Sequence, residues 1–225
     1  MAVGRIRWLG HSGFEIELAN KILLIDPWLT GNPLAAMKAS DLKRADMVCV
    51  THDHGDHLGD AVEICKRTGA TFVGIHELGV YAEEQGVKDV VGINIGGTVD
   101  VKGISITMVQ AFHSSNRGAP TGFVIKAEGK AIYHAGDTGL FGDMKLIGEI
   151  HRPDVALIPI GDYYTMGSRE AAEAVKLIKS DVVIPMHYQT LPVLSQSAED
   201  FIKIVKEKSP KVKVVALKPG EVYQL

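Results

Sequence analysis

The chain has 225 residues, of which 46% are hydrophobic, and its formal net charge is −3 at pH 7. This composition excludes a disordered chain and suffices for one large core, so we expect a single domain over residues 1–225. The chain lacks the basic excess of a nucleic-acid binder, and its apolar runs are shorter than the roughly 18 residues of a membrane span. The first residues do not resemble a signal peptide and two cysteines are too few for a disulfide framework, so we expect a cytoplasmic protein.

Strands and helices alternate in the first third of the chain. Alternating or continuously apolar patterns predict strands at residues 5–10, 13–18, 22–26, 46–51 and 71–75. Helical periodicity predicts one helix that begins near Leu58 and stops at Gly69, and a second helix over 76–86. Cys49 and Cys65 fall within these elements as small core residues.

The middle of the chain is rich in strands, and the last third returns to alternation. Strands are expected at residues 96–101, 104–112, 122–128, 130–137, 154–161, 181–187, 211–217 and 221–225. Helices are expected over 168–179 and 197–208, with Ser168 and Ser197 as N-caps. This order favours an α/β fold in which two sheets face each other with helices outside.

The segment "THDHGDHLGD" (51–60) places three histidines and two aspartates within six residues, directly after a predicted strand. If the backbone is extended there, His52 and His54 project to the same side, and Gly55 allows the turn that brings Asp56 and His57 close. Crowded imidazoles and carboxylates are costly to bury unless a cation compensates them. The pattern therefore predicts one or two divalent metal ions at this strand end.

Three later strands also end in a residue that can bind a metal. His113 ends "ITMVQAFH", Asp137 ends "AIYHAGD", and His187 ends "DVVIPMH". The glycines beside Asp137 let the backbone approach closely. Each of these residues is ordinary alone, but together they can complete a site that the first cluster only begins.

The ordered set H-x-H-x-D-H (52–57), followed by His113, Asp137 and His187, resembles the metallo-β-lactamase superfamily. The segments "LGHSGFEIE", "IDPWLTGNP", "HAGDTG" and "IGDYYTMG" are similar to a branch of small metal-dependent hydrolases related to L-ascorbate-6-phosphate lactonases. The resemblance implies an αββα four-layer sandwich of two mixed β-sheets with helices on the outer faces. It also implies a site at one edge of the two sheets.

The same resemblance implies a ligand set for two metals. One metal would be bound by His52, His54 and His113, the second by Asp56, His57 and His187, and Asp137 would bridge them together with a water or hydroxide. His57 favours a binuclear site, because several branches of the superfamily lack this histidine. Imidazole and carboxylate ligands suit several metals, so we expect two divalent ions, with Zn²⁺ as the first choice and Mn²⁺, Fe²⁺ or Ni²⁺ as alternatives.

A divalent metal lowers the pKa of its bound water from 15.7 to about 7, which makes hydroxide available at neutral pH. Two divalent ions, offset by Asp56, Asp137 and one hydroxide, would leave a site charge of about +1. We therefore expect a hydrolase that cleaves a small, anionic or polarised substrate, such as an ester, a phosphoester or a lactone.

The candidate catalytic residues are Asp56, His11 and His134. His11 follows the first strand and either contacts the substrate or donates a proton at the metal edge, or forms a hydrogen-bonded turn. His134 is a candidate partner of the ligand Asp137 or a pocket residue. Asp26, which ends a buried strand, either orients a ligand histidine or caps a loop.

The loop that contains Tyr163, Tyr164 and Thr165 is the candidate substrate-binding segment, although its aromatic rings could equally pack on the edge of the core. Arg117 lies just beyond His113 and is either a contact for a substrate anion or an ordinary exposed arginine.

Three other functions share this histidine pattern. They are a mononuclear-iron oxidoreductase, an RNA- or DNA-processing nuclease, and a metal-binding protein without turnover. The nuclease is disfavoured because the chain shows neither a basic excess nor an evident insertion for an RNA-binding arm. A homo-oligomer is compatible with the sequence, and no membrane partner is expected.

Overall fold

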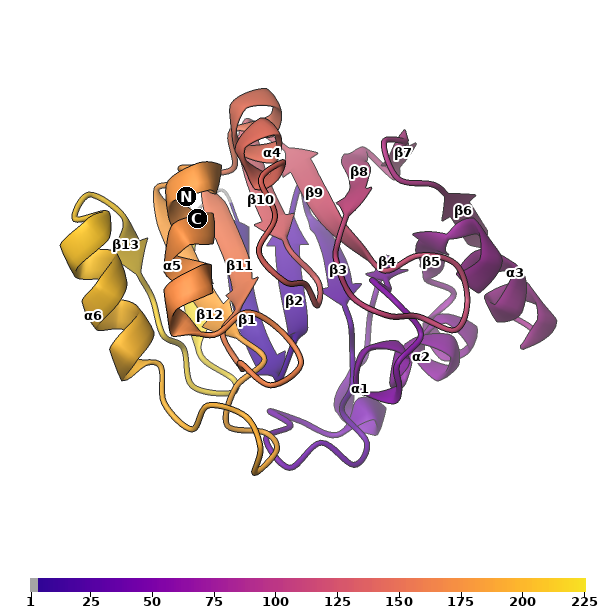
Figure 1. Cartoon of the computed structure of the whole chain (residues 1–225). Helices are drawn as coiled ribbons and strands as arrows, with labels where there is room; N and C mark the ends of the chain where they lie inside the picture. The colour runs from indigo at the N-terminus through magenta and orange to yellow at the C-terminus, as the bar shows by residue number, and fades with distance from the viewer. Residues whose placement is uncertain (1–3) are drawn as a thin grey trace.

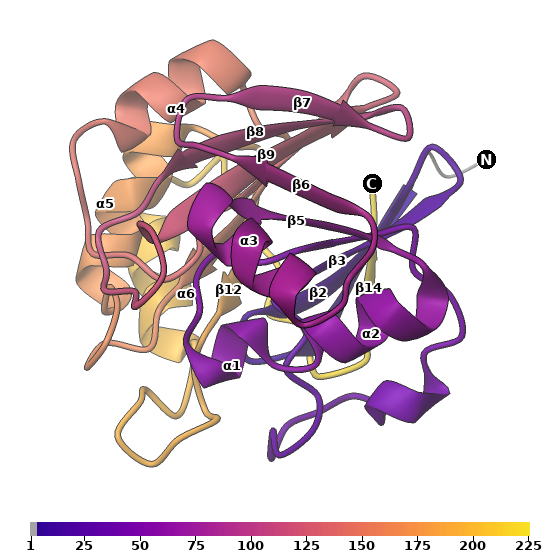
Figure 2. The same cartoon turned by 90° about the vertical axis from the view of Figure 1, so that its right-hand side faces the viewer.

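The computed structural model describes residues 4–225 as two seven-stranded β-sheets packed face to face, with helices on both outer faces (Figure 1). Viewed from the side, the four layers follow one another as helices, sheet, sheet and helices (Figure 2). The predicted α/β sandwich is therefore confirmed. No helix within the described residues is both long and apolar enough to span a membrane.

The first sheet has the strand order β14-β1-β2-β3-β4-β5-β6. Its strands are β1 (Gly4–Gly10), β2 (Gly13–Leu18), β3 (Lys21–Ile25), β4 (Met47–Cys49), β5 (Thr71–Ile75), β6 (Val90–Ile93) and β14 (Val222–Gln224). The strands from β14 to β3 pair antiparallel, and those from β3 to β6 pair parallel, so the sheet is mixed.

The second sheet has the strand order β13-β12-β11-β10-β9-β8-β7. Its strands are β7 (Thr98–Val101), β8 (Ile104–Gln110), β9 (Thr121–Ala127), β10 (Lys130–His134), β11 (Val155–Pro159), β12 (Val182–Met186) and β13 (Lys213–Val214). Antiparallel pairing runs from β7 to β10 and parallel pairing from β10 to β13. Because β8, β10, β11 and β12 all run in one direction, their carboxyl ends lie along one edge of the sheet.

Helices cover the outer faces because each has one apolar side. The first sheet is covered by α2 (Ala61–Thr68) and α3 (His76–Glu84), and the second by α4 (Met144–His151), α5 (Ser168–Ile178) and α6 (Glu199–Lys208). The short elements are α1 (Gly55–Leu58) and the 3₁₀ turn η1 (Ala39–Asp41). Neither β6 nor α4 was predicted from the sequence.

The helix expected to begin near Leu58 is divided into two. Gly59, with a φ of 42°, ends α1, and α2 begins two residues later. A Cβ atom at Gly59 would lie 2.6 Å from Cα of Trp28, so the break lets the chain pass against the loop that follows β3. The predicted stop at Gly69 is confirmed, because Gly69 adopts the left-handed conformation at the end of α2.

The two predicted serine N-caps are wrong. Gly167 is the N-cap of α5, and Ser168 is already its first helical residue. Ala198 is the N-cap of α6, and the Ser197 hydroxyl instead accepts a hydrogen bond from the Glu199 amide at 3.1 Å. Each N-cap therefore lies one residue away from the serine that the sequence pattern indicated.

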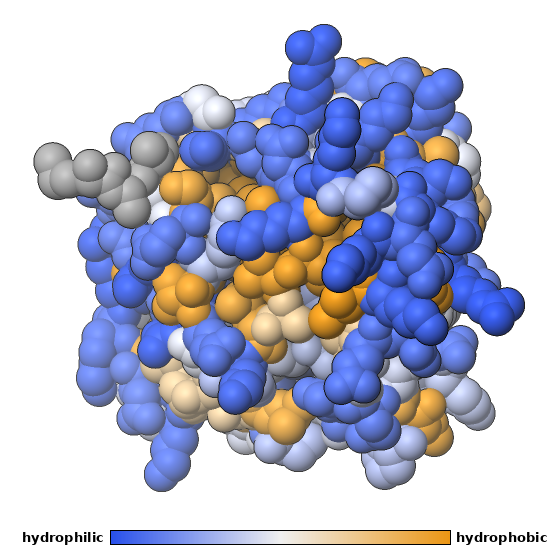
Figure 3. Space-filling model, turned by 90° about the vertical axis from the view of Figure 1, so that its left-hand side faces the viewer, coloured by the Kyte–Doolittle hydropathy of each residue, from blue (hydrophilic) through white to orange (hydrophobic). Residues whose placement is uncertain are grey.

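The core between the sheets is apolar and continuous. Cys49 and Cys65 are buried and free, as expected for small core residues. On the side of the molecule that carries α6 and β13, some apolar side chains reach the surface among charged ones (Figure 3). The outer strands β13 and β14 have only two and three residues, so these edges present little unpaired backbone.

Candidate metal centre

The predicted ligands converge at one edge of the sandwich, where strands of both sheets end. His52, His54 and His57 follow β4 of the first sheet, with His57 in α1. From the second sheet come His113, Asp137 and His187, which follow β8, β10 and β12, respectively. The two sheets therefore supply ligand-type side chains to a common volume.

One group consists of His52, His54 and His113, whose nitrogen atoms lie within 4.8 Å of one another. His52 Nε2 and His54 Nδ1 are 2.9 Å apart, and the His113 ring centroid is 5.1 Å from each of the other two. The structure thus brings His113 to a pair of imidazoles from a distant part of the sequence.

A second group is centred on Asp137. Its Oδ2 atom lies 3.0 Å from His187 Nε2, 3.2 Å from His57 Nε2 and 3.6 Å from His113 Nε2. Asp137 and His57 are also grouped with His52 as a potential ligand set. The Asp137 carboxylate therefore lies between the two groups of histidines.

His11 lies in the turn between β1 and β2, and its side chain reaches the second group. Its Nε2 atom is 3.1 Å from Asp56 Oδ2, and its ring centroid is 4.0 Å from that of His187. The Thr190 hydroxyl is 2.9 Å from His11 Nδ1 and holds the ring from the other side. His11, Asp56, His57 and His187 thus form a cluster of potential ligands.

Asp26 orients one of the predicted ligands. Its Oδ2 atom is 2.8 Å from His57 Nδ1 and accepts a hydrogen bond from the Thr51 hydroxyl at 2.7 Å. Its Oδ1 atom accepts a hydrogen bond from the Thr51 amide. With Nδ1 of His57 held by this carboxylate, Nε2 is the ring nitrogen that faces Asp137. Asp26 therefore fills both roles considered for it: it holds the ring of His57, and it accepts the backbone amide of Thr51 in the loop after β4.

The donor atoms fit a metal better than they fit one another. His57 Nε2 and Asp137 Oδ1 are buried without a hydrogen-bond partner, and so is His187 Nδ1. Buried polar atoms rarely lack partners in native proteins. Imidazole nitrogens and carboxylate oxygens converging without a thiolate are a donor set for zinc, manganese, iron or nickel.

The pKa values follow from burial and from neighbouring charges. Burial, reinforced by His57, lowers the pKa of His52 to about 2, and burial lowers that of His11 to about 4. Burial also disfavours charge on His57, but the carboxylates of Asp137 and Asp26 outweigh it and raise the pKa of His57 well above its usual value. Burial acts to raise the pKa of Asp137, but His187 and His57 hold it well below its usual value.

His134, predicted as a catalytic or pocket residue, has both of its ring nitrogens against backbone groups. Nε2 is 2.9 Å from the Ser12 carbonyl oxygen, and Nδ1 accepts a hydrogen bond from the Gly136 amide at 3.1 Å. The ring is fully buried and belongs to none of the three potential ligand groups. His134 connects the second sheet to the turn between β1 and β2.

The predicted tyrosine segment lies next to the metal centre. The Met166 amide, at the end of this loop, donates a hydrogen bond to the carbonyl of Thr138, which directly follows Asp137. Tyr163 and Tyr164 are exposed, and their rings meet edge to face at 4.8 Å. They therefore do not pack on the core, which was the alternative expectation.

Arg117 is not a free anion contact. Its guanidinium donates to Asp53 Oδ2 at 3.0 Å and lies 4.2 Å from the centre of the Tyr81 ring. Asp53 also accepts hydrogen bonds from the Ser115 hydroxyl and the Asn116 amide. Sequence reasoning missed Asp53, although an acidic residue between two ligand histidines was a visible signal. Asp53 holds the loop that follows His113 through these hydrogen bonds.

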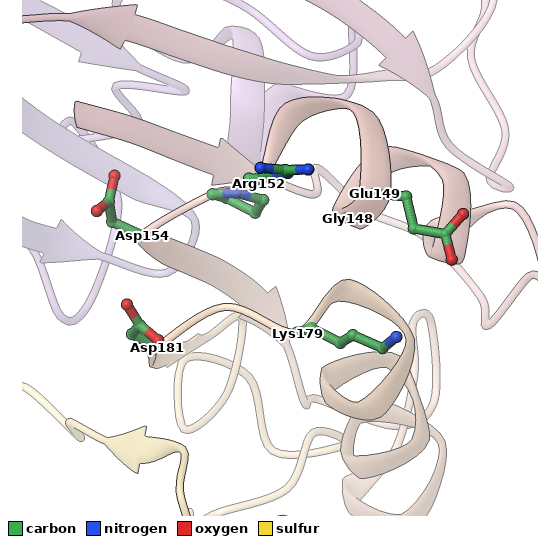
Figure 4. Close-up of a pocket in the computed structure, with 7 residues that line it drawn as sticks. Gly148, Glu149, Arg152, Asp154, Lys179 and Asp181 are labelled. Atoms are coloured by element: carbon green, nitrogen blue, oxygen red, sulfur yellow. The ribbon is translucent and has the colours of Figure 1, made fainter. Parts of the chain in front are cut away.

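A cavity of about 430 Å³ lies elsewhere, at the ends of α4 and α5 (Figure 4). Asp154 and Asp181, which line it, directly precede β11 and β12, whereas the predicted ligands follow the carboxyl ends of the strands. Figure 4 shows these aspartates at one end of the cavity and Glu149 and Lys179 at the other. This cavity is therefore separate from the metal centre.

Comparison with known proteins relates the whole chain to metal-dependent enzymes. Residues 5–187 match the family described as the beta-lactamase superfamily domain. A UPF0173 metal-dependent hydrolase of Methanopyrus kandleri is 56% identical over 98% of this chain and 99% of its own length. One from Caldivirga maquilingensis is 52% identical over 99% of each chain. The solved structure of Igni18, a metallo hydrolase from Ignicoccus hospitalis, has a TM-score of 0.93 at 43% identity and covers 99% of this chain and 98% of that one.

Proposed function

The chain belongs to the metallo-β-lactamase superfamily, and on this premise we propose that it is a metal-dependent hydrolase with a binuclear centre. The observation that carries the proposal is the position of Asp137, whose carboxylate lies between two groups of histidines at the edge of the sandwich. The relatives named as metal-dependent hydrolases support the same activity.

In this proposal, His52, His54 and His113 would hold one metal, Asp56, His57 and His187 would hold the other, and Asp137 could contribute to both; His52, His54 and His113 lie together, and so do Asp56, His57 and His187. Divalent ions bound there would acidify water and polarise a carbonyl or phosphoryl oxygen. Zn²⁺ is our first choice, and Mn²⁺, Fe²⁺ and Ni²⁺ suit the same donor atoms.

The surrounding residues position these ligands. Asp26 fixes the ring of His57 so that Nε2 carries the lone pair. His11 holds the Asp56 carboxylate through Nε2 and is itself held by Thr190 through Nδ1. We assign to His11 the role of orienting Asp56 at the substrate side of the centre. Asp56 in turn is both a ligand and a candidate catalytic group.

The charges of the centre favour a substrate that is anionic or becomes so during reaction. Asp56 and Asp137 supply two negative charges, which offset only part of the charge of two divalent ions. Esters, lactones and phosphoesters all present an oxygen that gains negative charge when they are hydrolysed. We propose a small molecule of one of these classes as the substrate.

The experiment measures bound metal and hydrolysis of p-nitrophenyl esters and bis(p-nitrophenyl) phosphate by the metal-loaded protein, before and after His57→Ala. We expect two ions per chain in the parent protein, and weaker metal binding with a loss of turnover of at least about tenfold in the variant. His76→Ala is the matched control, because His76 is exposed at the start of α3.

A fully active His57→Ala protein would contradict the binuclear centre. One iron per chain with oxygen consumption would select the oxidoreductase, and cleavage of RNA or DNA would select the nuclease.

A further inference from the structure

Aromatic side chains exposed to solvent gather on the loops of the metal centre. Among the described residues, the large hydrophobic side chains that are exposed include three aromatic rings, those of Phe112, Tyr163 and Tyr164, with exposed fractions of 60%, 70% and 52%. Phe112 directly precedes the ligand His113. Leu140, 40% exposed, lies three residues after Asp137. We call these four residues the aromatic rim.

The rim residues come from three loops that are joined at Thr138, the residue after Asp137. The Thr138 hydroxyl accepts a hydrogen bond from the Phe112 amide at 2.9 Å, and its carbonyl accepts one from the Met166 amide at 3.1 Å. The Phe112 carbonyl in turn accepts one from the Gly139 amide at 3.0 Å. These hydrogen bonds therefore join the loops after β8, β10 and β11 to one another next to Asp137 in the chain.

The fold itself does not require this apolar surface. The ring of Tyr163 contacts that of Tyr164, which is also exposed. The ring centroid of Phe112 lies 5.1 Å from that of the buried Phe141, and Phe112 itself stays exposed. Exposed apolar groups lose the free energy that burial would give, about 25 cal/mol per Å². Clustered exposed apolar side chains mark ligand or partner sites more often than scattered ones do.

The charged side chain closest in sequence to His113 also favours an apolar ligand at this edge. The basic side chain nearest in sequence to the ligand His113 is that of Arg117, and it is engaged by Asp53 and Tyr81. If the metal centre recognises the reacting group, the neighbouring rim residues offer aromatic and aliphatic carbon to the rest of the substrate.

We propose that the aromatic rim binds an apolar acyl, alkyl or aryl group of the substrate, so that the substrate is an ester or phosphoester with a hydrophobic substituent next to the bond that is cleaved. This inference rests on the proposed function, because the metal centre holds the polar end of the same molecule. It makes Phe112, Tyr163 and Tyr164 the residues that determine specificity.

The test measures binding of methyl-, butyl- and octylphosphonate to the zinc-loaded protein by calorimetry. The phosphonate group serves as a probe for the metal centre, and the alkyl chain of the phosphonate serves as a probe for the rim. Affinity should rise by about two- to fourfold per methylene, since a buried methylene contributes up to about 0.8 kcal/mol. In the triple variant Phe112→Ser, Tyr163→Ser, Tyr164→Ser, this dependence on chain length should be lost.

The matched control is Ile150→Ser, which removes an apolar side chain with an exposed fraction of 68% from α4 and should leave the dependence unchanged. Equal affinity for the three phosphonates in the parent protein would overturn the inference, and so would failure of all three to bind. Retention of the chain-length dependence by the triple variant would overturn it as well.

Failure of the proposed function gives a different result. If octylphosphonate binds through the rim but neither esters nor phosphodiesters are hydrolysed, the hydrolase fails and the apolar subsite stands. If hydrolysis occurs without dependence on the length of the alkyl chain, the hydrolase stands and the subsite fails.

Sedimentation of the parent protein and of the triple variant tests whether a second copy of the protein covers the rim instead. A dimer that is lost in the variant, with no dependence of phosphonate affinity on alkyl-chain length, would overturn the role of the rim in substrate binding.

Discussion

Individual histidines in this protein have different tasks because their two ring nitrogens have different neighbours. His57 is bound by the Asp26 carboxylate on one nitrogen and faces Asp137 with the other, which suits a metal ligand. His134 is only a few residues from Asp137, but backbone groups occupy both of its nitrogens. The sequence pattern grouped these residues as functional, whereas their hydrogen bonds favour a ligand role for His57 and a structural role for His134.

We predict that Asp53→Ala loosens the loop that follows His113. The change leaves the Asn116 amide without its acceptor and the Ser115 hydroxyl with only the Arg117 carbonyl, and a hydrogen bond to a charged group contributes about 1.5–3 kcal/mol. Amide exchange at Asn116 should become faster, and metal binding should weaken through His113. Asp100→Ala is the control, because Asp100 holds only the exposed turn at Gly103. Unchanged amide exchange at Asn116 would contradict the assigned role of Asp53.

We predict that His134→Gln reduces the dependence of stability on pH. Burial lowers the pKa of His134, so the folded protein keeps the ring neutral while the unfolded chain takes up a proton below about pH 6.5. Its contribution to stability is therefore complete above pH 6.5 and decreases as the pH falls, by at most about 1.4 kcal/mol per pH unit. Glutamine can make both hydrogen bonds but does not titrate.

Urea unfolding of the metal-free protein at pH 7.0 and 5.5 measures this effect. The parent should lose more stability between the two values than the glutamine variant, and equal losses would refute the prediction.

At the scale of elements, packing explains where sequence patterns were insufficient. The strand β6 was missed because its four residues include a glycine and are not fully buried. The helix α4 was missed although Met144 and Ile147 are buried on one side, because Gly148 interrupts the run. A glycine inside a helix disfavours it by about 1 kcal/mol relative to alanine. The structure shows that this glycine allows α4 to approach α5.

We predict that Gly148→Ala destabilises the protein despite the higher helix propensity of alanine. A Cβ atom there would lie 2.2 Å from the carbonyl oxygen of Ile178, the last residue of α5, so one helix must move. Overpacking of this kind costs about 1–3 kcal/mol. Thermal unfolding measures the effect, with Gly142→Ala as the control, because no atom lies within 4 Å of its added Cβ. Equal melting temperatures for the two variants would show that α4 can move freely.

For the whole molecule, the candidate metal centre draws its residues from both sheets. His52, His54 and His57 follow a strand of the first sheet, and His113, Asp137 and His187 follow strands of the second. Ions held between them would join the sheets at one edge, so metal binding and stability of the whole fold should be coupled.

We predict that removing metal with a chelator lowers the melting temperature of the protein. Zinc at 100 times its dissociation constant would stabilise the folded state by about 2.7 kcal/mol, or about 5–10 °C for a chain of this size. Scanning calorimetry with and without zinc measures the shift, and Asp137→Asn should show a much smaller one. A melting temperature that is insensitive to zinc in the parent protein would exclude ions that connect the sheets.

The sequence by itself determined the α/β class and most strands, because the alternation of apolar residues is a local pattern. The seven residues of the predicted ligand set followed from the resemblance of their order to the metallo-β-lactamase superfamily. Only the tertiary structure decided which of these side chains meet. Contacts such as those of Asp26 with His57, of Asp53 with the loop after His113, and of the rim loops at Thr138 join segments that are far apart in the chain. Such contacts depend on how two sheets pack against each other, and no periodicity within one segment records that geometry.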